Sequence, residues 1–140
     1  MKKIRVGIIG VGNMGKNHAR VYSEIADLVA VSDIDEEQGL EIVNKYEAIF
    51  YKDYRQMIEE QSIDAISVVV PTTLHKEIVI DCLKMKIPTL VEKPIAGNLI
   101  DAKQMLHFAE KYKTFLMIGH VERFNPAIIK LKKIIDEGRL

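Results

Sequence analysis

The chain has 140 residues, of which 48% are hydrophobic and 29% are charged, and its formal net charge is zero. This length suits one globular domain, and the balanced charge argues against nucleic acid or a membrane surface as the main partner. Cys82 is the single cysteine, which excludes an internal disulfide framework and favours a cytoplasmic protein. Its apolar neighbours are typical of a small buried side chain rather than a nucleophile. The four histidines show no metal-ligand spacing, so no metal site is predicted.

Strand-like and helix-like patterns alternate along the chain almost without interruption. Strands are predicted at residues 4–9, 28–32, 48–51, 65–70, 89–91 and 115–118, and helices at residues 13–25, 35–46, 53–60, 74–84, 98–112 and 126–137. The expected helix N-caps are Asp35, Asp53, Thr73 and Asn125. The first helix is expected to place five side chains on one face, Met14, His18, Val21, Tyr22 and Ile25. Six strands with helical crossovers predict an α/β fold, a doubly wound parallel sheet in the order 3-2-1-4-5-6.

Three glycines, Gly10, Gly12 and Gly15, separate the first strand from the first helix in the spacing G-x-G-x-x-G. In this context Gly10 allows a tight turn, Gly12 lets a pyrophosphate approach the backbone, and Gly15 lets the helix pack close to the strand. Asn13 and Met14 lie between the second and third glycines and are further candidate cofactor contacts. The helix that starts here turns free N–H groups and its positive dipole end towards the phosphates. A glycine-rich turn of another α/β protein is the alternative.

Asp33 closes the second predicted strand, where dinucleotide-binding folds place a carboxylate that accepts the hydroxyls of the adenosine ribose. A carboxylate at this position repels a 2′-phosphate, and residues 32–38 contain no arginine or lysine to neutralise one. NAD is therefore the predicted cofactor, and NADP is less favoured. The alternative is that Asp33 only caps a helix, although Asp35 is better placed for that task.

A doubly wound sheet binds its ligand at the carboxyl ends of its strands. After the fourth strand, backbone groups of Pro71 and Thr72 are expected to reach the middle of the cofactor. His75, in the next helix, is either a ligand-facing group or a structural hydrogen-bonding group, and both interpretations stay open. After the fifth strand, Glu92 and Lys93 form an adjacent charged pair, and a desolvated lysine there can transfer protons or stabilise an alkoxide. An exposed pair of loop charges is the alternative.

These motifs together resemble the amino-terminal half of the Gfo/Idh/MocA family of NAD(P)-dependent oxidoreductases. The resemblance covers essentially the whole chain and rests on residues 10–18, 71–75 and 91–96 and on the segment around Arg123. It implies that Lys93 is catalytic beside the nicotinamide, that Glu92 contacts the nicotinamide ribose and that Arg123 lies near the nicotinamide end. The implied reaction is hydride transfer between NAD and a secondary alcohol of a sugar or nucleotide sugar. Residues 119–127 are most similar to the branch of UDP-N-acetylglucosamine 3-dehydrogenases.

Members of this family carry a second α+β domain after the last helix seen here, and we expect that domain to be missing from the chain. The expected organisation is a dinucleotide-binding Rossmann domain over residues 1–122 and a linker helix over residues 123–140. The resemblance further implies a homo-oligomer, and we expect the 140-residue chain alone to be inactive. Apolar residues on several sides of the last helix predict dimerisation or limited solubility: Ile128, Ile129, Leu131, Ile134 and Ile135.

Two other functions stay open. A non-catalytic NAD-binding sensor or interaction module would keep the same fold. Another Rossmann reductase, similar to dihydrodipicolinate reductases, would share the glycine motif. The run of Glu92, Lys93 and Pro94 argues against both, because a sensor has no need of a proton-handling lysine and the reductase resemblance does not include this element.

Overall fold

The computed structural model of the chain describes residues 3–140. Six strands of this part form one parallel sheet in the order β3-β2-β1-β4-β5-β6, which confirms the predicted order. The strands are β1 (Arg5–Ile9), β2 (Asp27–Ser32), β3 (Ile49–Tyr51), β4 (Ala65–Val68), β5 (Thr89–Val91) and β6 (Leu116–Ile118). The strand order reverses between β1 and β4, and at such a point a doubly wound sheet opens a crevice for a ligand.

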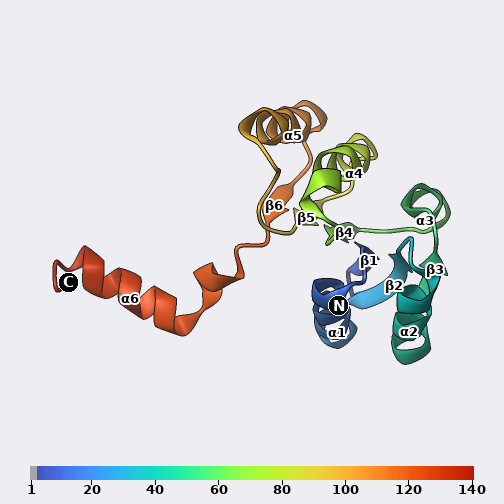
Figure 1. Ribbon diagram of the computed structural model, residues 1–140, viewed down its shortest axis with the longest axis horizontal. Helices are drawn as coiled ribbons and strands as arrows, with labels where there is room; N and C mark the ends of the chain where they lie inside the picture. Colours follow the sequence, from blue (N-terminus) through green and yellow to red (C-terminus); the bar gives the residue numbers. More distant parts are fainter. Residues whose placement is uncertain (1–2) are drawn as a thin grey trace.

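Helices alternate with the strands along the chain (Figure 1). They are α1 (Asn13–Ile25), α2 (Glu36–Tyr46), α3 (Tyr54–Glu60), α4 (Thr72–Lys84), α5 (Leu99–Tyr112) and α6 (Pro126–Asp136). Every predicted strand and helix is present, and each boundary lies within two residues of its prediction. A short 3-10 helix, η1 (Val121–Phe124), follows β6 and was absent from the prediction.

Three of the four predicted N-caps are confirmed. The side chains of Asp35, Asp53 and Asn125 each accept hydrogen bonds from backbone N–H groups in the first turn of α2, α3 and α6. The prediction of Thr73 as the cap of α4 is wrong, because that helix begins at Thr72, directly after Pro71. Pro71 has a φ of −54° and a ψ of 141°, so its rigid extended backbone leads straight into the helix without a side-chain cap.

Helices cover the sheet on both faces, and each face has its own apolar core. Along β1, Ile8 packs with α1 and α2 and Ile9 with α3, α4 and α5, because side chains alternate between the faces of a strand. Cys82 of α4 lies in the larger of the two cores, as the sequence predicts. Burial raises the pKa of its free thiol to about 12, so the thiol stays protonated at neutral pH.

The buried face of α1 differs from the prediction. Its buried residues are Gly15 and Ala19, whereas the side chains of Met14 and Ile25 are 44% and 68% exposed. The physical reason is the close approach of this helix to the glycine loop and sheet, which leaves room only for small side chains at the contact. His18 and Tyr22 are half-buried beside that contact.

The β5–β6 side of the sheet has less cover than the β1–β3 side. Leu90 and Met117 are paired neighbours on the face opposite α5, and both are only half-buried. The α6 helix has no buried residue and extends away from the sheet (Figure 1). Within residues 3–140, no helix combines the length and the apolar character that a membrane span requires.

Candidate cofactor site

The glycine loop between β1 and α1 turns at Gly10, whose φ of +91° strains any residue other than glycine. A Cβ atom on Gly15 would lie 2.1 Å from the carbonyl oxygen of Gly10, so the packing of helix against loop also requires glycine there. Gly12 differs, because within 4 Å a Cβ atom on it would meet only the Gln38 side chain, at 3.7 Å. The fold therefore requires the first and third glycines, whereas the second leaves open space at the start of α1.

A cavity of about 520 Å³ lies beside this loop at the carboxyl ends of β1, β2 and β4. Its volume is in the range of small-molecule and cofactor sites. Four of the predicted cofactor residues line it, namely Gly10, Gly12, Asp33 and Pro71. The other seven lie outside its lining: Asn13, Met14, Thr72, His75, Glu92, Lys93 and Arg123. The cavity thus corresponds to the end of the crevice where the adenosine half of a dinucleotide is expected.

Asp33 is held firmly at the end of β2. Its Oδ2 atom accepts the backbone N–H of Val11 in the glycine loop at 2.7 Å, and its Oδ1 atom accepts the backbone N–H of Asp35 at 2.9 Å. These bonds orient the carboxylate beside the cavity. An ionised carboxylate has about four acceptor positions, so acceptor capacity remains for two further donors such as ribose hydroxyls.

Six charged or polar lining residues were not predicted as cofactor contacts: Ser32, Asp35, Gln38, Lys52, Tyr54 and Glu77. Lys52 follows β3, and the pairing of β3 with β2 brings it to the same side of the sheet as Asp33. The hydroxyl of Tyr54 donates to Asp81 at 2.8 Å. Burial, together with this hydrogen bond, raises the pKa of Tyr54, so the phenol is neutral at physiological pH. The predicted strand order contained a signal for Lys52 that was not used, because it places β3 beside β2 and so brings the turn after β3 next to Asp33.

Asp35 adds a second carboxylate to the lining. Its Oδ2 atom accepts the side-chain amide of Gln38 at 2.7 Å, and its Oδ1 atom accepts the backbone N–H groups of Glu37 and Gln38. The hydrogen bonds from Gln38, first from its side chain and then from its backbone, lower the pKa of Asp35. The lining therefore contains three acidic side chains, Asp33, Asp35 and Glu77, against the single ammonium group of Lys52.

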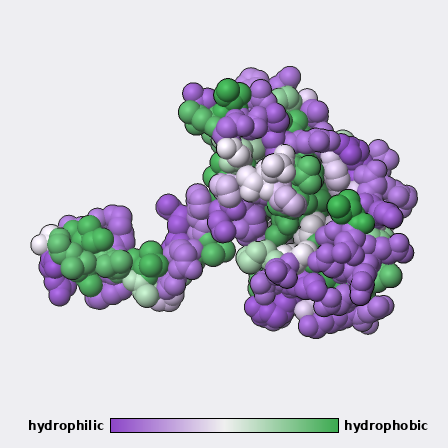
Figure 2. All heavy atoms as spheres, in the orientation of Figure 1, coloured by the Kyte–Doolittle hydropathy of each residue, from purple (hydrophilic) through white to green (hydrophobic). Residues whose placement is uncertain are grey.

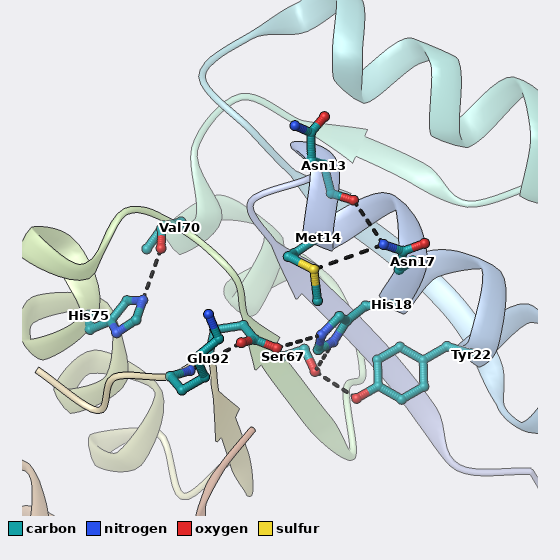
Figure 3. A network of polar contacts seen from close by, with 10 residues as sticks. Asn13, Met14, Asn17, His18, Tyr22, Ser67, Val70, His75 and Glu92 are labelled. Atoms are coloured by element: carbon teal, nitrogen blue, oxygen red, sulfur yellow. Dashed lines mark hydrogen bonds and ion pairs between the residues drawn. The ribbon is translucent and has the colours of Figure 1, made fainter. Parts of the chain in front are cut away.

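Beyond the cavity, a network of polar side chains connects α1 with the ends of β4 and β5 (Figure 3). The Nε2 atom of His18 lies 3.1 Å from Oε1 of Glu92, and its Nδ1 atom lies 3.3 Å from Oγ of Ser67. The hydroxyl oxygens of Tyr22 and Ser67 are 2.6 Å apart. Glu92 is buried, and its Oε2 atom accepts the backbone N–H of Lys93 at 3.1 Å. The sequence predicts His18 on the same helix face as Tyr22 but does not predict its contacts with Ser67 and Glu92.

Lys93 itself is exposed, and within residues 3–140 its ammonium group forms no ion pair. The expectation of a desolvated lysine is therefore wrong for this chain, in which Glu92 is the buried member of the pair. The reason is local: β5 ends at Val91, and Lys93 and Pro94, joined by a cis peptide bond, lie beyond the covered part of the sheet.

His75 is buried in α4 and connects two strand-end loops. Its Nε2 atom lies 2.9 Å from the carbonyl oxygen of Val70, and its Nδ1 atom lies 3.0 Å from that of Pro94. Of the two interpretations left open by the sequence, structural hydrogen bonding fits these contacts. The ring thereby lies between the loop that carries Lys93 and the loop after β4, and the N–H of its neutral form can donate to one of the two carbonyl oxygens.

The remaining predicted contacts lie around the open end of the crevice. Asn13 and Met14 are exposed in the first turn of α1, and Thr72 is half-buried at the start of α4. Arg123 is exposed in η1, the segment that leads away from the sheet (Figure 1). Of the predicted residues outside the lining, Asn13 and Thr72 thus directly follow the lining residues Gly12 and Pro71 in the chain.

The parallel sheet of this order, the glycine loop, the acidic residue at the end of β2 and the adjoining cavity define a dinucleotide-binding Rossmann domain. A family model described as the Gfo/Idh/MocA oxidoreductase family, NAD-binding Rossmann fold, matches residues 4–120. The chain therefore belongs to this family and is its NAD-binding domain, as the motifs indicated. The open side of Gly12 and the acceptor positions of Asp33 fit NAD.

Curated relatives include the myo-inositol 2-dehydrogenase of Thermotoga maritima, 35% identical over 140 residues, and the UDP-N-acetylglucosamine 3-dehydrogenase of Acidithiobacillus ferrooxidans, 30% identical over 133 residues. These matches cover 98% and 95% of the chain but only 42% of each relative, so the chain spans about two fifths of their length.

Solved structures show the same partial coverage. The myo-inositol 2-dehydrogenase from Lactobacillus plantarum has a TM-score of 0.92 at 29% identity, over 99% of this chain and 42% of that one. The WlbA dehydrogenase from Chromobacterium violaceum, solved with NADH and UDP-GlcNAcA, has a TM-score of 0.92 at 27% identity, over 99% of this chain and 41% of that one.

Proposed function

We propose that the chain is the cofactor-binding domain of a dehydrogenase that transfers hydride between NAD and a secondary alcohol of a sugar or nucleotide sugar. The observation that carries this proposal is the cavity in which Gly12 and the oriented carboxylate of Asp33 meet. Relatives named for inositol and for UDP-N-acetylglucosamine support a polyhydroxylated substrate. Bound NAD supplies the hydride acceptor. Residues 119–127 favour the nucleotide-sugar branch.

Each end of the site has its own proposed tasks. At the cavity, the open side of Gly12 admits the pyrophosphate, and Asp33 accepts the adenosine ribose hydroxyls. At the open end, Glu92 contacts the nicotinamide ribose, with Arg123 near the nicotinamide. Lys93, exposed there, orients the reacting hydroxyl and takes part in its proton transfer. We place the cofactor domain in residues 1–122 and a linker to a second domain in residues 123–140.

We further propose a preference for NAD over NADP. Three acidic side chains in the cavity lining repel a 2′-phosphate, which carries up to two negative charges. Lys52 lies outside residues 32–38 but lines the same cavity, and its ammonium group reduces this repulsion. The balance of three carboxylates against one ammonium group supports the preference, with Lys52 limiting its size.

The exposed apolar surface of η1 and α6 supports an oligomer of the chain, with a second copy covering this surface. Hydrophobic atoms gather on the extended α6 segment, at the left of Figure 2. The exposed apolar side chains are Phe124, Ile128, Ile129, Leu131 and Ile135. Such a surface is larger than scattered single apolar residues and is typical of an interface. Sedimentation of the wild-type chain and of Ile129→Glu tests this proposal, and a wild-type monomer at all concentrations contradicts it.

A cytoplasmic location is proposed from Cys82. The thiol is free and buried, and it is the single cysteine of the chain. Proteins of a reducing compartment keep their thiols free and are stable without disulfides, which fits a single free cysteine.

Calorimetric titration of the chain with NADH and NADPH tests the cofactor proposal. We expect clear binding of NADH and weaker binding of NADPH. Absence of NADH binding would contradict the proposed function. A parallel assay of the 140-residue chain with NAD and candidate sugars is expected to show no turnover. A protein partner whose binding depends on NAD would instead favour the sensor interpretation.

A further inference from the structure

We propose that His18 is a positioning residue for Glu92 at the nicotinamide end of the cofactor site. The proposal rests on the proposed function, because it assigns His18 a task in holding the carboxylate that meets the nicotinamide ribose. His18 lies in the second turn of α1, the helix whose first turn is proposed to face the pyrophosphate. One helix would therefore serve both the phosphates and the reactive end of the cofactor.

Glu92 is a buried carboxylate and needs partners, since an unpaired charge in such a place is costly. Within residues 3–140, the imidazole of His18 is the one side chain within hydrogen-bond distance of it. The backbone N–H of Lys93 holds the other oxygen. Gly119 closes the remaining space, because a Cβ atom there would lie 3.0 Å from Oε1 of Glu92. The carboxylate is thus held on both oxygens.

The network fixes the tautomer of His18. An ionised carboxylate only accepts hydrogen bonds, so Nε2 of His18 donates to Glu92. In the neutral ring Nδ1 then accepts from the hydroxyl of Ser67. The oxygen of Ser67 in turn accepts from the hydroxyl of Tyr22 at 2.6 Å. Every group in this chain of contacts is satisfied, and Ser67 and Tyr22 together hold the ring in one orientation (Figure 3).

The position of the network indicates a task beyond stability. A buried ionic or polar pair is often replaceable by apolar side chains of similar volume at no loss of stability, so a core alone does not need it. Here the pair lies at the carboxyl end of β5, directly before the exposed Lys93. Ligands of a doubly wound sheet bind at these strand ends. We infer that His18 keeps the carboxylate of Glu92 turned towards the site.

The test compares two ligands that share one end. NADH contacts both ends of the site, whereas ADP carries no nicotinamide ribose and occupies only the cavity end. In His18→Asn the amide reaches about as far as Nδ1 and loses Glu92, while in His18→Gln the amide nitrogen reaches about as far as Nε2 and keeps a donor for Glu92. We expect His18→Asn to weaken NADH binding about tenfold, the size of one lost hydrogen bond to a charged group, and to leave ADP binding unchanged. His18→Gln should retain most of the NADH affinity.

Two further variants test the pairing. Glu92→Leu removes both carboxylate oxygens and should weaken NADH binding at least as much as His18→Asn does. Adding His18→Asn to Glu92→Leu should weaken binding no further, because His18 acts only through that carboxylate. Ser67→Ala leaves the backbone of β4 intact, and we expect it to weaken NADH binding about threefold without changing ADP binding, because it releases the ring. If His18→Asn fails to fold, Ser67→Ala tests the positioning role in its place.

The outcomes separate the two proposals. Equal weakening of NADH and ADP by His18→Asn, or by Ser67→Ala if only that variant folds, would show a general structural role and overturn the positioning proposal. Unchanged NADH binding in the same variant would also overturn it. If the wild-type chain binds neither ligand, the proposed function itself fails. Wild-type binding of both ligands with no selective loss in the variants leaves the proposed function standing and removes only this inference.

Discussion

The two sides of the sheet differ in how completely the chain covers them. Around β1, β2 and β3, helices pack on both faces and the strand ends enclose the cavity. Around β5 and β6, one face is packed against α4 and α5, while Leu90 and Met117 on the other face are half-buried and Lys93 lies exposed. The cavity end of the site is therefore formed within this chain, and the end around Lys93 stays open.

This difference separates two requirements of a dinucleotide site. Binding of the adenosine half needs backbone N–H groups, a glycine without a side chain and one oriented carboxylate, all of which the first two βα units supply. At the reactive half, the charged groups around the substrate must be shielded from water, so protein has to cover this part of the site on all sides.

Two alanine substitutions in the glycine loop separate stability from cofactor binding. Gly15→Ala places a Cβ atom 2.1 Å from the carbonyl oxygen of Gly10, a backbone atom that cannot rotate away, and should destabilise the fold by about 3 kcal/mol or more. Gly12→Ala meets no such atom and should change the free energy of unfolding by less than about 1 kcal/mol. It should nevertheless weaken NADH binding about a hundredfold, because its Cβ atom occupies the place of the pyrophosphate.

Urea unfolding and NADH titration measure both effects. A Gly15→Ala variant as stable as the wild type would contradict the structural role of Gly15. A Gly12→Ala variant with wild-type NADH affinity would contradict the role of Gly12 in cofactor binding.

Two methionines compare the covered and the open sides directly. Met57 in α3 is fully buried against the β1 side, and Met57→Ala should cost about 3 kcal/mol, as other buried Met-to-Ala changes do. Met117 in β6 is half-buried on the open face, and Met117→Ala should cost about 1 kcal/mol. Chemical denaturation of both variants gives the two values. Equal costs would mean that β6 is as well packed as the rest of the sheet.

The sequence predicted the fold almost completely, because the signals were local. Alternating strand and helix patterns, three confirmed aspartate or asparagine caps and the glycine turn each act over a few residues. Right-handed crossovers reduce the possible strand orders to a few, the glycine motif favours the order of dinucleotide-binding folds, and the sheet has that order. Pro71 is the informative exception, since the proline's own backbone geometry started α4 two residues early.

The site was less predictable because its contacts join distant parts of the chain. Asp33 was found by its distance from the glycines, but Lys52 reaches the same cavity through the pairing of β3 with β2. His18 and Glu92 are 74 residues apart. One local signal pointed to their network: Ser67 is the single polar residue in the apolar run of the fourth strand, and a buried hydroxyl needs a partner.

Asp33 links the cavity to the glycine loop, so its removal should affect both binding and stability. Asp33→Ala leaves the N–H groups of Val11 and Asp35 without their acceptors, at a cost of about 2 kcal/mol in stability. It should also weaken NADH binding at least about tenfold, the size of one lost hydrogen bond to a carboxylate. NADPH binding should fall less, since repulsion of the 2′-phosphate is relieved. Parallel titrations with both nucleotides give the ratio, and an equal loss for both would contradict the assigned role.

Replacing Lys52 should have the smallest effect of these substitutions, and it tests how the charges of the cavity lining set the preference between NADH and NADPH. Lys52→Met keeps the length of the side chain but removes the opposing charge, so NADPH binding should weaken about threefold while NADH binding changes little. The difference should shrink as salt is raised, because the lysine is exposed and its field is screened. Lys103→Met, an exposed lysine of α5 outside the cavity, is the matched control and should change neither affinity. Equal weakening of both nucleotides by Lys52→Met would mean that Lys52 contacts a part that NADH and NADPH share, and the acidic lining alone would then set the preference for NAD.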